Sequence, residues 1–149
     1  MKVYKIFSRD KKCAVLDSQE TGELLKSRYA GKVGEVNTRY VCWCLDRNDN
    51  NRLKVLDFPL SVARSIGNRQ VASGKQISGV KEGCDWQIMT NGRTGKEVRY
   101  DTVYLNDSIL TESEIQMIKD KRESKDSKFN LMDIFKPLNL TEAEEKLFG

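Results

Sequence analysis

Two strand-like runs separated by a cluster of turn-forming residues constrain the fold of this chain most strongly. Residues 39–46 (RYVCWCLD) and residues 52–58 (RLKVLDF) are rich in aromatic and β-branched side chains. The five residues between them, RNDNN, favour turns and tolerate the left-handed backbone region. The pattern predicts a β-hairpin. Its first strand has apolar side chains on both faces, so we expect that strand to be central in a sheet.

The rest of the first 110 residues adds strands and one short helix to this hairpin. Pro59 ends the second strand, and the apolar spacing after it predicts a short helix that ends at Gly67 or in the polar stretch beyond. Further predictions are strands over 3–7 and 13–16, a long loop over 17–38 with a helical turn at 23–26, and a second hairpin of residues 85–90 and 96–104. This order predicts a mostly β fold, namely an OB-like small Greek-key barrel with a short helix between its hairpins.

The C-terminal residues differ from the rest of the chain in charge and in pattern. Residues 1–110 contain 19 Lys and Arg against 13 Asp and Glu, whereas residues 111–149 contain 7 against 9. Capping-box patterns begin at Thr111 and at Thr141, which predicts a helix after each, and residues 122–128 (RESKDSK) read as a charged linker. We therefore divide the chain into a barrel domain over 1–110 and a C-terminal segment over 111–149 with a helical tail.

No pattern in the sequence predicts catalysis. The chain contains no histidine, the side chain that most often serves as general acid or base near neutral pH. Phosphate loops, GxSxG nucleophile elbows and HExxH metal motifs are also missing from the sequence. The four cysteines, Cys13, Cys42, Cys44 and Cys84, lack the paired spacing of structural zinc ligands. We therefore expect a non-enzymatic protein with reduced thiols, no cofactor and no metal.

The sequence gives no sign of secretion or of insertion into a membrane. No stretch approaches the roughly 18 consecutive apolar residues that a membrane-spanning helix needs. The first residues, MKVYKIFSRDKK, contain neither a long apolar region nor a small-residue cleavage site. We therefore expect a cytoplasmic protein that has no membrane among its partners.

Basic and aromatic residues are interleaved along the predicted strands. A surface that binds single-stranded nucleic acid needs cations that follow the phosphates and flat rings that stack on the bases. Alternatively, the aromatic side chains belong to the core and the cations to an ordinary solvated face; for Trp43 we favour the core. Phosphate contacts are predicted for Arg39, Lys54, Arg93, Lys96 and Arg99, and base stacking for Tyr40, Trp86 and Tyr100.

The same residues carry a family resemblance. The run YVCWCLDRNDNNRLKVLDFPLSVARSI, followed by GCDWQIMTNGRTGKEVRYDTVYL, resembles the core of bacteriophage single-stranded DNA-binding proteins with an OB fold. The resemblance covers about residues 39–105. It implies binding without sequence preference, and an acidic tail that recruits replication proteins and competes with DNA for the barrel groove. Some members carry a zinc element before this core, but residues 17–38 contain no cysteine, so that feature is not implied here.

We therefore expect a protein that coats and protects single-stranded DNA during phage DNA replication or recombination, in the host cytoplasm. The alternative is a protein–protein adaptor of a phage replication or transcription complex that binds no nucleic acid. The sequence leaves DNA and RNA undistinguished, because no residue that reads the 2′-OH is identifiable. The tail, residues 123–149, either packs on the barrel or is mobile and presents Leu147 and Phe148 to replication proteins; we favour the interaction tail.

Overall fold

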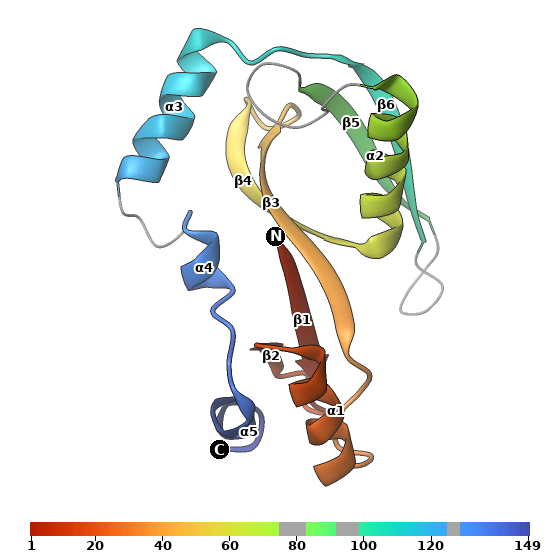
Figure 1. Ribbon diagram of the computed structural model, residues 1–149. Coiled ribbons are helices and arrows are strands. Elements are labelled where there is room, and N and C mark those ends of the chain that lie inside the picture. The colour runs from red at the N-terminus through yellow and green to blue at the C-terminus, as the bar shows by residue number, and fades with distance from the viewer. Residues whose placement is uncertain (75–82, 92–98, 125–128) are drawn as a thin grey trace. The chain divides into compact units, whose positions relative to one another are not determined.

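The computed structural model describes residues 1–74, 83–91, 99–124 and 129–149, and for Asn91 and Arg99 it describes the backbone alone. The chain divides into two compact units. The terminal unit comprises Met1–Asp57 and Lys125–Gly149, and the central unit comprises Phe58–Ser124. The elements, labelled in Figure 1, are β1 (Lys2–Phe7), β2 (Cys13–Leu16), α1 (Gln19–Arg28), β3 (Asn37–Asp46), β4 (Arg52–Pro59), α2 (Leu60–Ser73), β5 (Cys84–Asn91), β6 (Arg99–Asp107), α3 (Glu112–Glu123), α4 (Leu131–Ile134) and α5 (Leu140–Phe148).

The terminal unit is built on a four-stranded sheet with the strand order β2-β1-β3-β4. Strand β1 runs antiparallel to both of its neighbours, so Tyr4 lies opposite Leu16 on one side and Thr38 on the other. Because side chains alternate along a strand, Tyr4 and Leu16 face one side of the sheet while Val3 faces the opposite side. Each of these two faces is covered by a different part of the chain.

Helices α1 and α5 cover the first face. The rings of Tyr29 and Phe148 stack with their centroids 4.2 Å apart, and Arg28 forms an ion pair with Glu144 at 2.8 Å. The two helices therefore contact each other as well as the sheet, as Figure 1 shows beside β1 and β2. The buried apolar residues on this face are Ile6, Ala14, Leu16, Leu25, Ala143 and Leu147.

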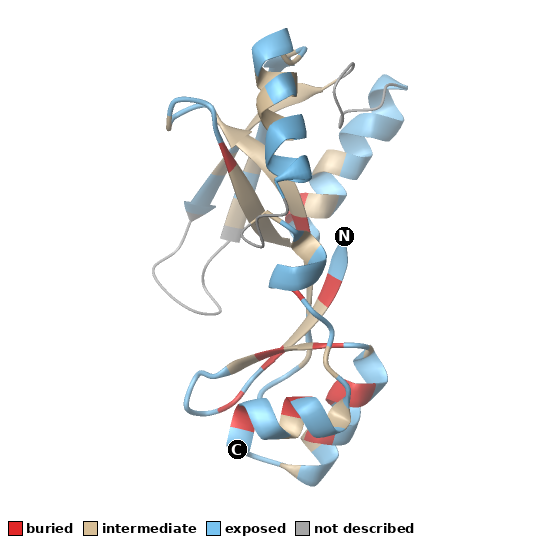
Figure 2. Ribbon diagram, turned by 90° about the vertical axis from the view of Figure 1, so that its left-hand side faces the viewer, coloured by how far each residue is buried: buried red, intermediate tan, exposed pale blue. Residues whose placement is uncertain are grey.

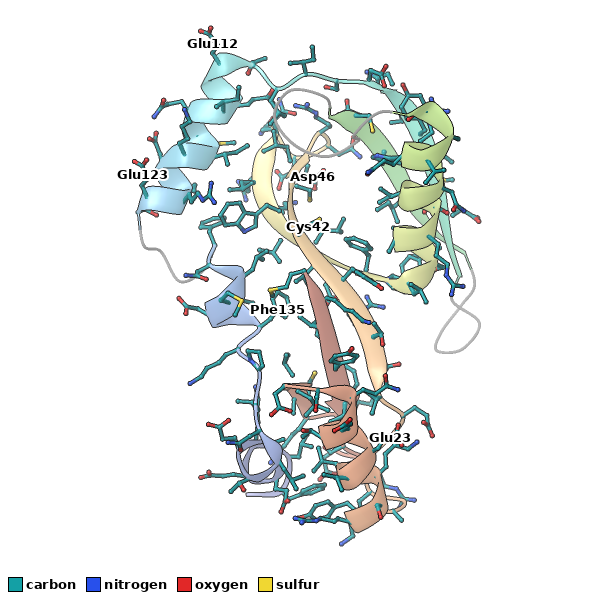
Figure 3. The ribbon with its side chains drawn as sticks, in the orientation of Figure 1. Glu23, Cys42, Asp46, Glu112, Glu123 and Phe135 are labelled. Carbon is teal, nitrogen blue, oxygen red and sulfur yellow. The ribbon has the colours of Figure 1, made fainter. Side chains whose placement is uncertain are left out.

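The short helix α4 and the residue after it cover the second face. Val3, Val41 and Phe135 form a buried cluster there, and Leu131 packs against it. The side chain of Asn130 caps α4 by accepting hydrogen bonds from the N–H groups of the first turn. Figure 3 labels Phe135 at the end of α4. Residues near the C-terminus therefore complete the core on this face as well.

Between α4 and α5 the chain follows the outer edge of β2. The carbonyl oxygen of Leu138 accepts from the N–H of Asp17 at 3.0 Å, and the N–H of Leu138 donates to the carbonyl oxygen of Val15 at 3.0 Å. The expectation of a mobile tail is therefore wrong for residues 129–149. Leu147, which we expected to be presented to a partner, is buried in the core of the terminal unit.

Helix α1 replaces part of the loop predicted over residues 17–38 and includes the helical turn predicted at 23–26. Ser18 caps it by accepting from the N–H of Thr21 at 3.2 Å. In the sequence, Gly22 favoured a loop, but in the structure a glycine is required at this position by packing. A Cβ atom there would lie 2.3 Å from the side chain of Val36, so only a residue without a side chain allows this close approach.

The first hairpin is confirmed. Strands β3 and β4 are neighbours in the sheet, and β3 is a central strand as expected. In the turn, the N–H of Asp49 donates to the carbonyl oxygen of Asp46 at 3.1 Å. Asn50 and Asn51 adopt φ angles of 51° and 55°, the left-handed conformation that asparagine tolerates better than most residues.

The central unit contains a second antiparallel hairpin, β5 and β6, and helix α2 packs on β6. Helix α2 extends beyond Gly67, the first of its two predicted ends, into the polar stretch that was the second, and its left-handed cap is Gly74 with φ 65°. An exposed glycine inside a helix costs only about 1 kcal/mol, so Gly67 does not stop it. The predicted capping box at Thr111 is confirmed at the start of α3. The box predicted at Thr141 is wrong, because α5 is capped two residues earlier by Asn139 with Glu142.

The chain is a mixed α/β protein with its described strands in two separate antiparallel sheets, and these strands do not close into the expected OB-like barrel. A barrel requires continuous strand pairing around the ring. Here the outer edge of β2 is bonded to Leu138 instead of to another strand, and β5 pairs with β6. The two units also divide the chain differently from the boundary near residue 110, because the C-terminal segment shares the core of the first strands.

Candidate nucleic-acid interface

The residues predicted to bind nucleic acid are divided between the two units. Arg39, Tyr40 and Lys54 belong to the terminal unit. The other five belong to the central unit, on or between the strands of its hairpin: Trp86, Arg93, Lys96, Arg99 and Tyr100. The charges and contacts of the two groups differ.

Arg39 is held in an ion cluster that joins three neighbouring strands. Its Nε donates to Oδ1 of Asp57 at 2.8 Å, and a terminal nitrogen donates to the Asp57 carbonyl oxygen at 3.2 Å. Lys5 on β1 binds the other carboxylate oxygen of Asp57. Partial burial raises the pKa of Asp57, but the hydrogen bonds from Lys5 and Arg39 outweigh it and hold the pKa below its ordinary value. This arrangement favours a structural role for Arg39.

Lys54 is also paired with carboxylates. Its Nζ lies 2.7 Å from Asp46 and 2.9 Å from Asp49, which together carry more negative charge than Lys54 neutralises. The hydrogen bond to Asp46, and then that to Asp49, raises the pKa of Lys54, and the same bonds lower the pKa values of both carboxyls. Figure 3 labels Asp46 at the end of β3. Lys54 therefore braces the hairpin turn, and Arg52 also lies 3.8 Å from the carboxylate of Asp49. The charge of Lys54 is already engaged by carboxylates, which favours a structural role for this residue.

Tyr40 lies on β3 opposite Lys2 of β1 and is half-buried. The alternation of the strands puts Tyr40 on the face that α1 and α5 cover, away from Arg39. The three predicted residues of the terminal unit therefore do not form one surface.

The hairpin of the central unit brings several predicted residues to one end. Tyr100 lies opposite Thr90, and Arg99 lies opposite Asn91, at the last pairs before the connection between β5 and β6. Arg93 and Lys96 belong to that connection, and both lie outside the described residues. Along the chain, Arg93 follows Asn91 by two positions and Lys96 precedes Arg99 by three. Of the four predicted residues, the structure thus places Tyr100 and the backbone of Arg99 at the end of the ribbon next to the connection.

Trp86 lies near the opposite end of the hairpin, on the same face as Tyr100. It pairs with Tyr104 across the strands, and the two rings meet edge to face with centroids 5.9 Å apart. Trp86 is half-buried, so part of its ring is accessible. Tyr104 lies four positions after Tyr100 along β6, which is about 13 Å of extended strand. The hairpin therefore carries aromatic side chains at both ends of one face.

Arg69 of α2 joins this face, and our sequence reasoning missed it because the predicted end of the helix was left open between Gly67 and the polar stretch beyond. Its guanidinium lies over the ring of Tyr104, 4.0 Å from the centroid, in a cation–π contact. The hydroxyl of Tyr104 donates to Asp107 at 2.6 Å, and this bond raises the pKa of Tyr104. A helix extended to its glycine cap at Gly74 would have placed Arg69 on the same side as the buried Val62.

Within the described ranges, no group of three or more Cys, Asp and Glu side chains is arranged to hold a metal ion. The four cysteines are free thiols. Of the helices in the described part of the chain, none has both the length and the apolar character to span a membrane. Comparisons with protein-family models, with curated proteins and with solved structures gave no match.

Proposed function

We propose that this chain binds single-stranded nucleic acid without sequence preference, as a non-catalytic protein, through the β5–β6 hairpin of the central unit. DNA is the ligand we favour, and coating of replication or recombination intermediates is the role. The observation that carries the proposal is the register of the hairpin. It puts Arg99 and Tyr100 beside the connection that contains Arg93 and Lys96.

The chemistry of this face matches the two needs of a single strand. Tyr100 and Trp86 offer rings for bases, and base stacking on aromatic side chains is sequence-tolerant. Arg69 beside Tyr104 supplies positive charge for phosphates. In the sequence, Arg93, Lys96 and Arg99 add three cations in or next to the connection between β5 and β6. A two-stranded ribbon is sufficient for this function, so the proposal does not depend on a closed OB-like barrel.

The direct test is a fluorescence-anisotropy titration of the full chain with labelled single-stranded DNA, single-stranded RNA and duplex DNA at 50 and 200 mM salt. We expect tighter binding to single strands than to duplex, and a steep loss of affinity with salt, because bound cations release counterions from the phosphates. Undetectable binding to single-stranded DNA and RNA at 50 mM salt would contradict the proposal.

A variant pair assigns the binding to the hairpin. Replacing Arg93, Lys96 and Arg99 with alanine should flatten the slope of log affinity against log salt by about 2, at roughly 0.7 for each lost phosphate contact. The matched control removes the same charge from α3 of the same unit, at Lys119, Lys121 and Arg122. If both triple variants weaken binding equally, net charge and not the hairpin determines affinity.

A second candidate, the protein–protein adaptor, is favoured by the opposite face of the hairpin. Met89, Val103 and Leu105 lie there with 41%, 42% and 53% of their surfaces exposed. Exposed apolar side chains gathered on one face are typical of a protein-binding surface. The anisotropy titration separates the candidates, because an adaptor would leave every labelled oligonucleotide unbound.

A further inference from the structure

A tight turn of the terminal unit joins β1 to β2 and has its own hydrogen-bond network. The N–H of Ser8 donates to the carbonyl oxygen of Lys12 at 2.9 Å, and the N–H of Lys12 donates to the Ser8 hydroxyl at 3.2 Å. Lys11 adopts a φ of 60°, and its N–H donates to the Ser8 carbonyl oxygen at 2.9 Å. The backbone of this turn is therefore fixed without help from its basic side chains.

A second segment, after α1, is bonded to this turn. The N–H of Arg9 donates to the carbonyl oxygen of Lys32 at 3.0 Å, and the N–H of Gly34 donates to that of Phe7 at 2.9 Å. The guanidinium of Arg9 also lies close to Gly31, 3.8 Å from where a Cβ atom would be. Lys32 is thus brought beside the turn that carries Arg9, and we call Arg9, Lys11, Lys12 and Lys32 the basic turn.

The cations of the basic turn lack the carboxylate partners that other cations of the terminal unit have within the described residues. These four cations are exposed, and within the described residues none of them forms an ion pair; Asp10 is the acidic residue of the turn. By contrast, Lys5 and Arg39 share Asp57, and Lys54 binds two carboxylates. A concentrated positive charge on a fixed backbone is an electrostatic site for a polyanion.

An aromatic ring accompanies these cations. Phe7 is the last residue of β1 and lies opposite Cys13, directly before the turn. Its side chain is 43% exposed although phenylalanine usually favours burial, and its carbonyl oxygen accepts from Gly34 of the second segment. Cations beside an accessible ring are the pairing that single strands recognise.

We propose that the basic turn with Phe7 is a second contact for single-stranded nucleic acid, carried by the terminal unit. This inference rests on the proposed function, since it assigns further contacts to the same ligand. The four cations contact phosphates, and a base stacks on Phe7. The predicted residues Arg39 and Lys54 are less suited to this role, because their charges are already held by carboxylates.

The test compares two charge-matched variants of the full chain by anisotropy with a fluorescein-labelled 20-nucleotide oligo(dT) between 50 and 200 mM salt. The basic-turn variant carries Arg9→Gln, Lys11→Gln, Lys12→Gln and Lys32→Gln. The control variant carries Lys2→Gln, Lys119→Gln, Lys136→Gln and Lys146→Gln, all at exposed positions. A third variant, Phe7→Ala, tests the ring.

We expect the basic-turn variant to flatten the salt slope by about 2–3, at roughly 0.7 for each phosphate contact, and the control to flatten it by less than about 1. Phe7→Ala should weaken binding about 5-fold or more with the slope unchanged. Equal slopes and affinities for the basic-turn and control variants would overturn the inference while leaving the proposed function intact.

Two other outcomes are also decisive. No binding of the oligonucleotide by the unaltered chain would overturn both the proposed function and this inference. A separate binding measurement uses vesicles that contain phosphatidylserine. If the unaltered chain binds these vesicles, and the basic-turn variant loses that binding but keeps its affinity for oligo(dT), the turn recognises an anionic lipid surface and the inference is wrong.

Discussion

The terminal and central units bury their side chains to very different extents. In the terminal unit, a sheet is covered on both faces, and buried apolar side chains come from β1, β2, α1, β3, β4 and the C-terminal segment. In the described part of the central unit, Val62 is the one apolar residue that is fully buried. Figure 2 shows the buried positions concentrated near α1, α5 and the first two strands.

This difference indicates a division of roles. The central unit combines a two-stranded hairpin with α2 and α3 and buries little apolar surface in its described part. A two-stranded hairpin depends on such packing, because in isolation it is at best marginally stable. Regions that bind ligands are commonly the less stable parts of a protein. We therefore expect the terminal unit to supply most of the stability and the central unit to gain order when it binds.

The largest expected effect is on the core of the terminal unit. Leu25→Ala and Leu147→Ala should each lower the free energy of unfolding by about 2–5 kcal/mol, because each replaces a buried side chain with a cavity. The matched control is Leu24→Ala in the same helix, since Leu24 is 49% exposed and Leu25 is 0% exposed. Urea unfolding followed by circular dichroism measures all three. A small effect of Leu147→Ala would mean that the C-terminal helix is not part of this core.

The next effect separates binding from stability in the central unit. Tyr100→Ala should lower the affinity for single-stranded DNA by about 5- to 100-fold, which corresponds to roughly 1–3 kcal/mol for one stacked base. Its melting temperature should change little, because Tyr100 is only half-buried. Tyr100→Phe keeps the ring and should keep the affinity. Equal losses in both variants would show that the hydroxyl group, and not stacking, is what matters.

A smaller effect concerns the ion cluster of the terminal unit. Because the pKa of Asp57 is lower in the folded chain than in the unfolded chain, its contribution to stability is fully present above the unfolded pKa of about 4. That contribution is lost as the pH falls through the folded pKa. Asp57→Asn should lower the free energy of unfolding at pH 7 by about 1–2 kcal/mol. This value is small because the Asp57 side chain is partly exposed and solvent screens its ion pairs. At pH values below the folded pKa of Asp57 the variant and the unaltered chain should converge, as urea unfolding at several pH values will show.

The smallest effect compares thiols of the two units. Burial, and then the neighbouring Cys42, raises the pKa of Cys44 to about 11, so its reactive thiolate is scarce at pH 8. Alkylation of Cys44 by iodoacetamide should be about 100-fold slower in the folded chain than in urea. Cys84 of the central unit should react faster than Cys44, which peptide mass spectrometry can follow. Equal rates in the folded chain would contradict the difference between the units.

Local patterns in the sequence predicted the hairpins correctly. The turn between β3 and β4 follows from Asn50 and Asn51, and the start of α3 follows from its capping box at Thr111, because these signals lie within a few residues. Of helix α1 only a turn at 23–26 was predicted, because Gly22 resembles a loop residue. The reason for this glycine is its contact with Val36, which is too distant from Gly22 in the sequence for a local pattern to show.

Features that depend on distant residues could not be predicted in this way. The pairing of Arg39 with Asp57 and of Lys54 with Asp46 depends on strand register, so the sequence showed these cations without their partners. Likewise, the apolar residues of the tail did not indicate which strands they pack against. The basic turn could not be predicted from the sequence, because Lys32 lies beside Arg9 only through backbone hydrogen bonds between two separate segments.

Hydrogen exchange of the full chain, with and without a 20-nucleotide oligo(dT), tests the division of roles most directly. Without the oligonucleotide, amides of β1 and α5 should exchange more slowly than those of β5 and β6, since slow exchange follows local stability. With it, protection should increase in β6 near Arg99 and Tyr100 and in the turn after Phe7, and it should stay unchanged in α5. Protection that increases in α5 but not in β6, or in neither region, would contradict the account.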